Sequence, residues 1–159
     1  MTGKTHIMAG IAATTAIVAL TDAYQPEWFI AAGVAGGLLP DICHSGSKIG
    51  RRFPILSKVI NTIFGHRTFT HSLLFLFLLA LILPRLISNP SITTGILVGM
   101  VTHFILDAAT KQGIKLLYPA KITIRFPITA RTGGKAENIF LLVLTVVTLY
   151  YANHMIDIF

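Results

Sequence analysis

The chain has 159 residues, of which 53% are apolar and only 12% are charged, and its mean hydropathy is +0.73. A soluble domain usually has about twice that share of charged residues, so composition excludes an ordinary soluble globular protein. The single cysteine excludes an internal disulfide framework and a cysteine-rich zinc module. A net charge of +7 suits nucleic acid, anionic lipid or the positive-inside bias of a membrane protein, and the last explains it without a nucleic-acid partner.

Five apolar segments follow one another along the chain, and several approach the roughly 20 residues needed to cross a bilayer. Between the second and third segments, the apolar residues of 45–67 suit an amphipathic helix that lies on the membrane. We therefore predict one all-α integral membrane domain over residues 1–159, a polytopic bundle of about five transmembrane helices plus this surface segment. The five predicted crossings are 5–20, 28–39, 70–87, 92–109 and 137–151.

Small residues indicate where two of these helices pack closely. Gly33 and Gly37 in the second segment, and Gly95 and Gly99 in the fourth, are spaced so that another helix can approach each backbone. Pro40 should interrupt the second segment, because proline removes a helical hydrogen bond and clashes with the preceding turn.

The basic residues predict the orientation. Five crossings place twelve of the thirteen Lys and Arg residues on one side, with Lys4 and the two long loops, and leave only Arg85 opposite. The positive-inside rule assigns the basic side to the cytoplasm. We therefore expect the N-terminus on the cytoplasmic side.

Histidines and acids gather at the cytoplasmic ends of four segments. His103 and Asp107 are four residues apart and share one helix face, and Asp41 and His44, three apart, would do so as well. Polar groups beside hydrocarbon are costly unless they are paired, so such a cluster is a candidate functional site. The candidate metal ligands are His6, Asp41, His44, His66, His71, His103 and Asp107.

The third segment carries two of these candidates. His66 and His71 would lie about 140° apart on a continuous helix. We therefore expect a loop-to-helix transition between them, near 68–70. His154 and Asp157 fall on the opposite face and are interpreted as ordinary interfacial residues.

Neutral imidazoles and carboxylates together are typical ligands of divalent metals. Each histidine alone is better explained as a hydrogen-bonded interfacial residue, but five at one depth favour a metal site. We expect one or two ions, with zinc favoured and manganese or magnesium as alternatives. Cys43 is either a small buried apolar residue or a soft ligand, and the sequence leaves both open.

Several motifs in this order resemble one known family. They are Thr5-His6, residues 37–44, residues 66–72, His103 with Asp107, residues 117–119, and residues 132–134 with Glu137. The set is similar to the YdjM-like family of bacterial inner-membrane proteins, which carry a metal-dependent hydrolase label. The resemblance covers nearly the whole chain and implies that activity and location. It departs at Cys43, where the family typically has a second acid, so a different metal count or a thiolate ligand stays open.

These observations predict a hydrolase for an ester or phosphoester of an anionic lipid or lipid-linked substrate at the cytoplasmic leaflet. Hydroxide generated on the metal would attack, and Asp41, Asp107 or Glu137 would accept the proton. Glu137 is equally explained as an acid that favours a helix N-terminus. Arg67 would hold the substrate anion with its planar guanidinium. The alternatives are a haem-binding protein and a cation or proton transporter that use the same cluster.

Overall fold

The computed structural model describes residues 1–21, 24–65 and 68–158, with side chains to Met155 at the C-terminal end. These ranges contain helices and no β-strand, which confirms the predicted all-α class. The elements are α1 (Gly3–Leu20), α2 (Pro26–Leu38), η1 (Leu39–Cys43), α3 (Lys48–Arg52), α4 (Pro54–Phe64), η2 (Phe69–His71), α5 (Leu73–Leu86), α6 (Pro90–Ala108) and α7 (Lys135–Ile158).

Among the described residues, three helices are long and apolar enough to cross a membrane: α1, α6 and the part of α7 up to Met155. The predicted second and third crossings correspond to α2 and α5, which have 13 and 14 residues. Both fall short of the roughly 20 residues that a straight crossing needs. The helical membrane bundle is therefore confirmed, whereas the count of five crossings stays a prediction.

Helices α2 and α6 form the centre of the bundle and meet through glycines. A methyl group at Gly99 would collide with the carbonyl oxygen of Gly33, and one at Gly36 would collide with the carbonyl oxygen of Ile96. The two predicted small-residue pairs thus pack against each other, because only hydrogen side chains allow this approach. This contact fixes the position of α6 relative to the end of α2, where the site lies.

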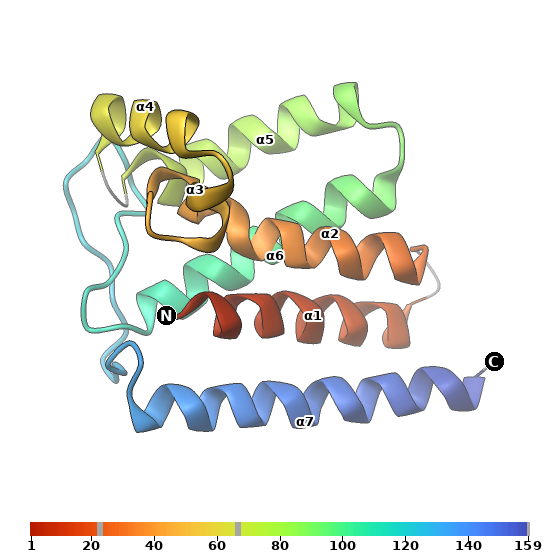
Figure 1. The fold of residues 1–159 in the computed structure, drawn as a ribbon. Helices are drawn as coiled ribbons and strands as arrows, with labels where there is room; N and C mark the ends of the chain where they lie inside the picture. The colour runs from red at the N-terminus through yellow and green to blue at the C-terminus, as the bar shows by residue number, and fades with distance from the viewer. Residues whose placement is uncertain (22–23, 66–67, 159) are drawn as a thin grey trace.

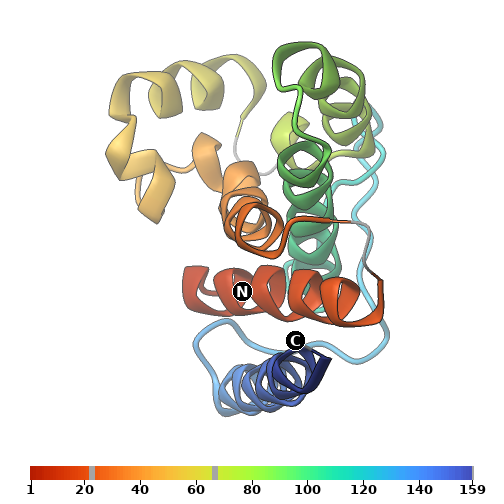
Figure 2. The same ribbon diagram turned by 90° about the vertical axis from the view of Figure 1, so that its right-hand side faces the viewer.

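The remaining helices surround this pair. Helix α1 packs against α2 and α6 on one side and against α7 on the other (Figure 2). Helices α3 and α4 lie to one side of α2, and α5 lies to the other (Figure 2). Much of α7 is unburied, and apolar side chains such as Leu142, Val146 and Leu149 are exposed, as expected of a lipid-facing helix.

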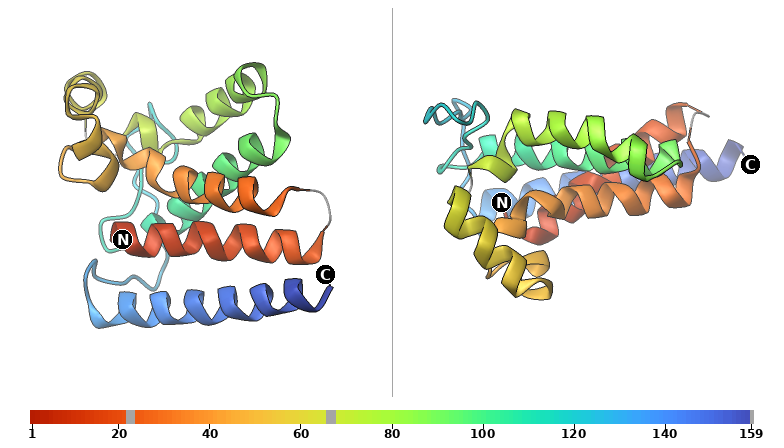
Figure 3. Two further views of the ribbon diagram at one scale, coloured as in Figure 1. Left: turned by 45° about the vertical axis from the view of Figure 1, so that its right-hand side comes forward. Right: turned by 90° about the horizontal axis from the view of Figure 1, so that it is seen from above.

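One end of the molecule collects the long loops. The N-terminus, α3, α4 and the loop 109–134 lie at this end, and the C-terminus lies at the other (Figures 1 and 3). The loop returns to the end of α6, where the Phe126 and Ala130 amides donate to the carbonyls of Ala108 and Ala109 at 2.9 and 2.8 Å. These bonds satisfy carbonyls that a helix leaves unpaired at its C-terminus. The loops predicted to share one side therefore do share one end of the bundle.

Candidate metal centre

Five candidate ligands converge at the end that carries the long loops. His6 lies in the first turns of α1, and His103 and Asp107 lie on one face of the last turns of α6. Asp41 is in η1, the short 3-10 turn that follows α2 at Pro40. His71 ends η2, just before Ser72 caps α5 by accepting from the Phe75 amide. Pro40 lies where α2 gives way to η1, and Ser72 begins α5, so each stands at a helix boundary beside a candidate ligand.

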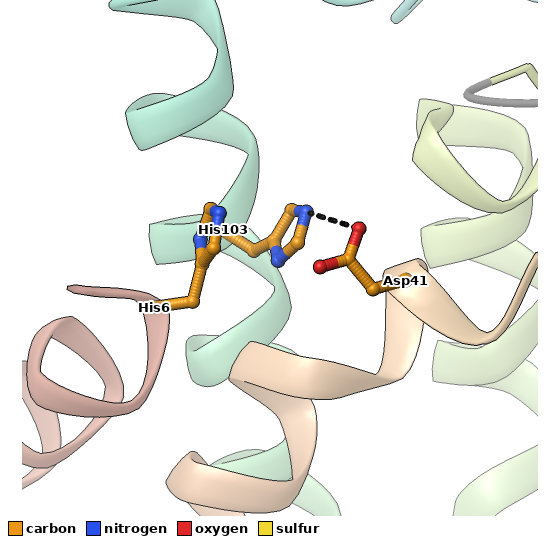
Figure 4. Close-up of side chains that lie close together, drawn as sticks. All are labelled: His6, Asp41 and His103. Carbon is orange, nitrogen blue, oxygen red and sulfur yellow. Dashed lines mark ion pairs between the residues drawn. The ribbon is translucent and has the colours of Figure 1, made fainter. Parts of the chain in front are cut away.

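The ring nitrogens and carboxylate oxygens of this cluster face one another. His71 Nε2 lies 3.3 Å from His103 Nε2 and 3.5 Å from Asp41 Oδ1. His103 Nε2 lies 3.6 Å from Asp107 Oδ2, and His6 Nε2 lies 3.3 Å from Asp107 Oδ1. The His6 and His103 rings stack with centroids 3.8 Å apart, and His103 Nε2 lies 3.9 Å from Asp41 Oδ1 (Figure 4).

The backbone of α2 orients His103. Its Nδ1 lies 2.8 Å from the carbonyl oxygen of Gly37, which can only accept, so Nδ1 carries the proton. The other ring nitrogen, Nε2, faces His71 and the carboxylates. Binding one imidazole nitrogen to a carbonyl so that the other faces a metal is the usual arrangement around protein-bound ions.

His71 is held in a similar way. Its Nδ1 lies 3.1 Å from the Thr70 hydroxyl, and its ring is fully buried. Its Nε2 faces His103 and Asp41, so the ring is oriented toward the other donor atoms of the cluster.

His6 gives the most direct test of whether the cluster fits a metal. Its ring is fully buried, yet within the described part of the chain neither of its nitrogens makes an aligned hydrogen bond. A buried polar group without a hydrogen bond is costly and needs an explanation. A bound cation provides one, because an imidazole lone pair satisfied by a metal needs no other partner. The Met1 ammonium, 2.6 Å from Asp107 Oδ1, shows that this carboxylate already faces positive charge.

The spacing of the donor atoms also fits a metal. Zinc binds nitrogen and oxygen at about 2.0–2.2 Å, so two ligands of a tetrahedral ion lie roughly 3.3–3.6 Å apart. Neighbouring donor atoms of the cluster are 3.3 to 3.9 Å apart, and the ligand atoms within each group lie within 4.8 Å of one another. The described residues form two overlapping groups of possible ligands, His6 with Asp41 and His103, and His71 with His103 and Asp107.

Asp41 is the ligand candidate that reaches the surface. Its side chain is 15% exposed, whereas the other four are at 0%. Burial raises the pKa of Asp41, but the hydrogen bond from His71 and the nearby imidazoles outweigh this and hold the pKa well below its usual value. The carboxylate is therefore ionised at neutral pH. It lines a cavity of about 390 Å³ together with His44, Ser47, Lys48 and Arg51.

Other predicted site residues lie apart from this cluster. His44 is exposed in the same cavity, and within the described ranges neither ligand group includes it or Cys43. The buried Cys43 thiol donates to the Pro40 carbonyl at 3.6 Å. His66 and Arg67 lie outside the described residues, so their predicted roles stay predictions.

Glu137 is buried, but its carboxylate is surrounded by fixed neutral donors. Oε1 accepts from the Thr2 amide, the Thr2 hydroxyl and the Thr5 hydroxyl at 2.6, 2.7 and 2.5 Å. Oε2 accepts from the Gly133 amide at 2.6 Å. The described ligand groups do not contain Glu137. The side chain therefore joins the start of α7 to the start of α1, and its role as a general base stays a prediction.

Three supporting groups were not predicted from the sequence: the Gly37 carbonyl, the Thr70 hydroxyl and the hydroxyls that hold Glu137. Thr5 and Thr70 each stand directly before a ligand histidine, at His6 and His71, and this adjacency is the signal that could have suggested them. The role of the Gly37 carbonyl has no such signal, because a backbone acceptor carries no mark in the sequence.

Comparisons with known proteins agree with this architecture. The family model described as "YdjM inner membrane protein" matches residues 1–157. The chain belongs to the YdjM family. The uncharacterized protein YvsG of Bacillus subtilis is 51% identical over 95% of this chain and 94% of its own length. The inner membrane protein YdjM of Escherichia coli is 33% identical over 98% of this chain and 85% of its own. No solved structure matches.

Proposed function

We propose that this YdjM-family protein is a metal-dependent hydrolase that cleaves an ester or phosphoester bond in an anionic lipid or lipid-linked substrate. One observation carries the proposal. Three imidazoles and two carboxylates lie close enough together to bind a metal. Of these five side chains, Asp41 alone lines the adjacent cavity. A purely structural polar cluster would not need an opening to a cavity.

A divalent ion in this cluster would supply a Lewis acid and an activated water at neutral pH. The three nitrogen donors favour zinc over magnesium, which prefers oxygen ligands and water. His103 has one available lone pair, because Nδ1 donates to Gly37. It therefore serves one ion only, and a second ion would need ligands other than His103.

The two carboxylates of the cluster have different roles in this reaction. Hydrolysis adds the hydroxyl of water to phosphorus or to a carbonyl carbon and breaks that atom's bond to the leaving oxygen. Asp41 faces the cavity, so it is the carboxylate placed to accept the proton that the water loses and to return it to the leaving oxygen. Asp107 is fully buried against His6, His71 and His103, which suits a ligand better than a proton carrier.

The position of the site supports a membrane-borne anionic substrate. The cavity also contains Lys48 and Arg51, which attract negative charge. The Escherichia coli relative is named an inner membrane protein, so we assign this chain to the inner membrane, with the site and N-terminus toward the cytoplasm under the positive-inside rule. A lipid headgroup already resides at that depth. The haem alternative is less well supported, because each described histidine of the cluster lies within 3.3 to 3.6 Å of a carboxylate.

The first experiment measures metal in the purified full-length protein and in three variants by elemental analysis. His71→Ala and His103→Ala should lower bound metal sharply, because each removes a proposed ligand. His154→Ala is the matched control, since His154 is exposed. Equal metal content in all three variants would overturn the metal site.

The second experiment tests hydrolysis. The protein is incubated with membrane lipid extract and metal, with and without a chelator, and the products are compared by mass spectrometry. A lipid species should disappear in a chelator-sensitive way. Arg67→Lys keeps the charge but loses the two-pronged geometry, so it should keep the metal and lose much of the turnover. If no species changes, the hydrolase proposal fails; full activity of Arg67→Lys would remove only the role of Arg67.

A further inference from the structure

A second hollow adjoins the cavity beside Asp41. It is a groove of about 370 Å³ lined by Ala35, Leu38, Leu39, Ile49, Ile96 and the stems of Lys48 and Arg52. Its lining is almost entirely apolar, whereas the cavity lining is more polar than apolar. Leu38, Lys48 and Ile49 line both hollows. The two therefore meet along α3, with a polar compartment on one side and an apolar compartment on the other.

The short helix α3 brings three cations to this junction. Lys48 and Arg51 line the cavity, and Lys48 and Arg52 line the groove. All three side chains are exposed, so their charged ends are available to a ligand while their stems cover apolar surface. Arginine and lysine in such positions bind phosphate and carboxylate groups.

The cations are held at a fixed position relative to Asp41. The Ser47 hydroxyl donates to the Asp41 carbonyl oxygen at 2.8 Å and accepts from the Gly50 amide at 2.8 Å. Gly50 also packs directly on the carbonyl of His44, where a side chain would collide. Helix α3 is thus tied to η1, and an anion bound by α3 is kept beside the proposed metal ligands.

We infer that the cavity and the groove form one site for an anionic lipid, with its phosphate-bearing head in the cavity and one hydrocarbon chain in the groove. Charge complementarity selects the head, and the apolar lining selects the chain. The neighbouring helix α4 exposes Ile55, Val59 and Ile63, a face suited to the membrane interface from which such a lipid would enter. The inference deepens the proposed function by identifying the residues that recognise the substrate.

The test measures binding to the purified full-length protein with three probes: dioctanoyl phosphatidylglycerol, dioctanoyl phosphatidylcholine and glycerol phosphate. The first has the predicted head charge and chain, the second lacks net charge, and the third lacks a chain. The anionic lipid should bind more tightly than either of the other two. Equal binding of the two lipids would overturn the inference.

Two variants with matched controls assign the compartments. Lys48→Ala combined with Arg51→Ala should lower the affinity for the anionic lipid by about fivefold for each charge removed. Lys58→Ala removes an exposed charge from α4, outside the linings given for both hollows, and should have little effect. Ala35→Trp should fill the groove and weaken the binding of the anionic lipid without weakening the binding of glycerol phosphate. Ala31→Trp, one turn earlier on the exposed side of α2, should do neither.

Each result tests the lipid site separately from hydrolysis, because the bound lipid is recovered and its mass is measured. If the lipid binds with this pattern but no species of the membrane lipid extract changes in a chelator-sensitive way, the site stands and the hydrolase proposal falls. If a chelator-sensitive product forms but Lys58→Ala weakens binding as much as the α3 variant, the hydrolase stands and this site falls. An unchanged affinity in Ala35→Trp would also overturn the placement of the chain.

Discussion

Asp107 and Glu137 are two carboxylates buried at the same end of the bundle, at 0% and 2% exposure, and their surroundings differ. Glu137 accepts four hydrogen bonds from backbone amides and threonine hydroxyls, with distances of 2.5 to 2.7 Å. Asp107 instead accepts from the Met1 ammonium at 2.6 Å and also faces three imidazoles at 3.3 to 3.7 Å.

The difference separates a structural carboxylate from a ligand. Fixed neutral donors hold both oxygens of Glu137, so the group stabilises the contact between α1 and α7. His103 shows the arrangement that fits a metal: its Nδ1 donates to the Gly37 carbonyl, so its Nε2 faces Asp107, and a cation between the two would satisfy both groups. Burial alone therefore does not identify the metal site; the chemistry of the neighbours does.

The largest expected effect is on metal binding by Asp107. Asp107→Asn keeps the shape but removes the charge, and it should lower zinc affinity by about a hundredfold or more. The measurement is competition with a zinc chelator of known affinity. Glu137→Gln makes the same change at the other carboxylate and should leave zinc affinity unchanged. If both variants lose zinc equally, the two groups do not have separate roles.

Glu137→Gln should instead lower stability. The amide places an NH₂ group against donors, so at least one buried donor loses its acceptor, at a cost of about 1–3 kcal/mol. The measurement is the midpoint of thermal unfolding in detergent, with Glu27→Gln as control because Glu27 is exposed. Equal midpoints for Glu137→Gln and the wild-type protein would mean that this carboxylate does not stabilise the joint between α1 and α7.

A smaller effect is expected at Thr70, which orients His71. Thr70→Val keeps the shape but removes the hydroxyl beside Nδ1, and it should weaken zinc binding by about tenfold. Thr62→Val is the control, because Thr62 is exposed on α4 and its hydroxyl bonds only locally, to the Lys58 carbonyl. Zinc affinity equal in the two variants would show that His71 is oriented by packing alone.

Much of this arrangement follows from local rules. The i, i+4 spacing predicted that His103 and Asp107 share a face, and the order of apolar segments predicted that His6, Asp41 and His71 meet them at one end. These predictions hold because the helices begin and end where Pro40 and Ser72 require. The glycine spacing likewise predicted close packing, since a backbone contact depends on small residues alone.

The sequence could not predict which polar residues turn inward beyond the helix ends. The i, i+3 rule grouped His44 with Asp41, but η1 ends at Cys43 and His44 adopts extended backbone angles, so the rule no longer applies. Glu137 shows the same limit. Its partners, Thr2 and Thr5, lie more than 130 residues away, and only the packing of α7 on α1 brings them together.

The smallest expected effect is at His44, and it sharpens the contrast between ligands and neighbours. His44 lines the cavity but is exposed and absent from the ligand groups of the described residues, so His44→Ala should change zinc affinity by less than about threefold. Because it faces the compartment proposed for the lipid head, the variant should raise KM while leaving metal content at the level of His154→Ala. A tenfold loss of zinc would instead return His44 to the ligand set. The exposure of a side chain in the metal-free protein would then not predict whether it binds the metal. In that case η1 would have to rearrange to bring the His44 ring inward.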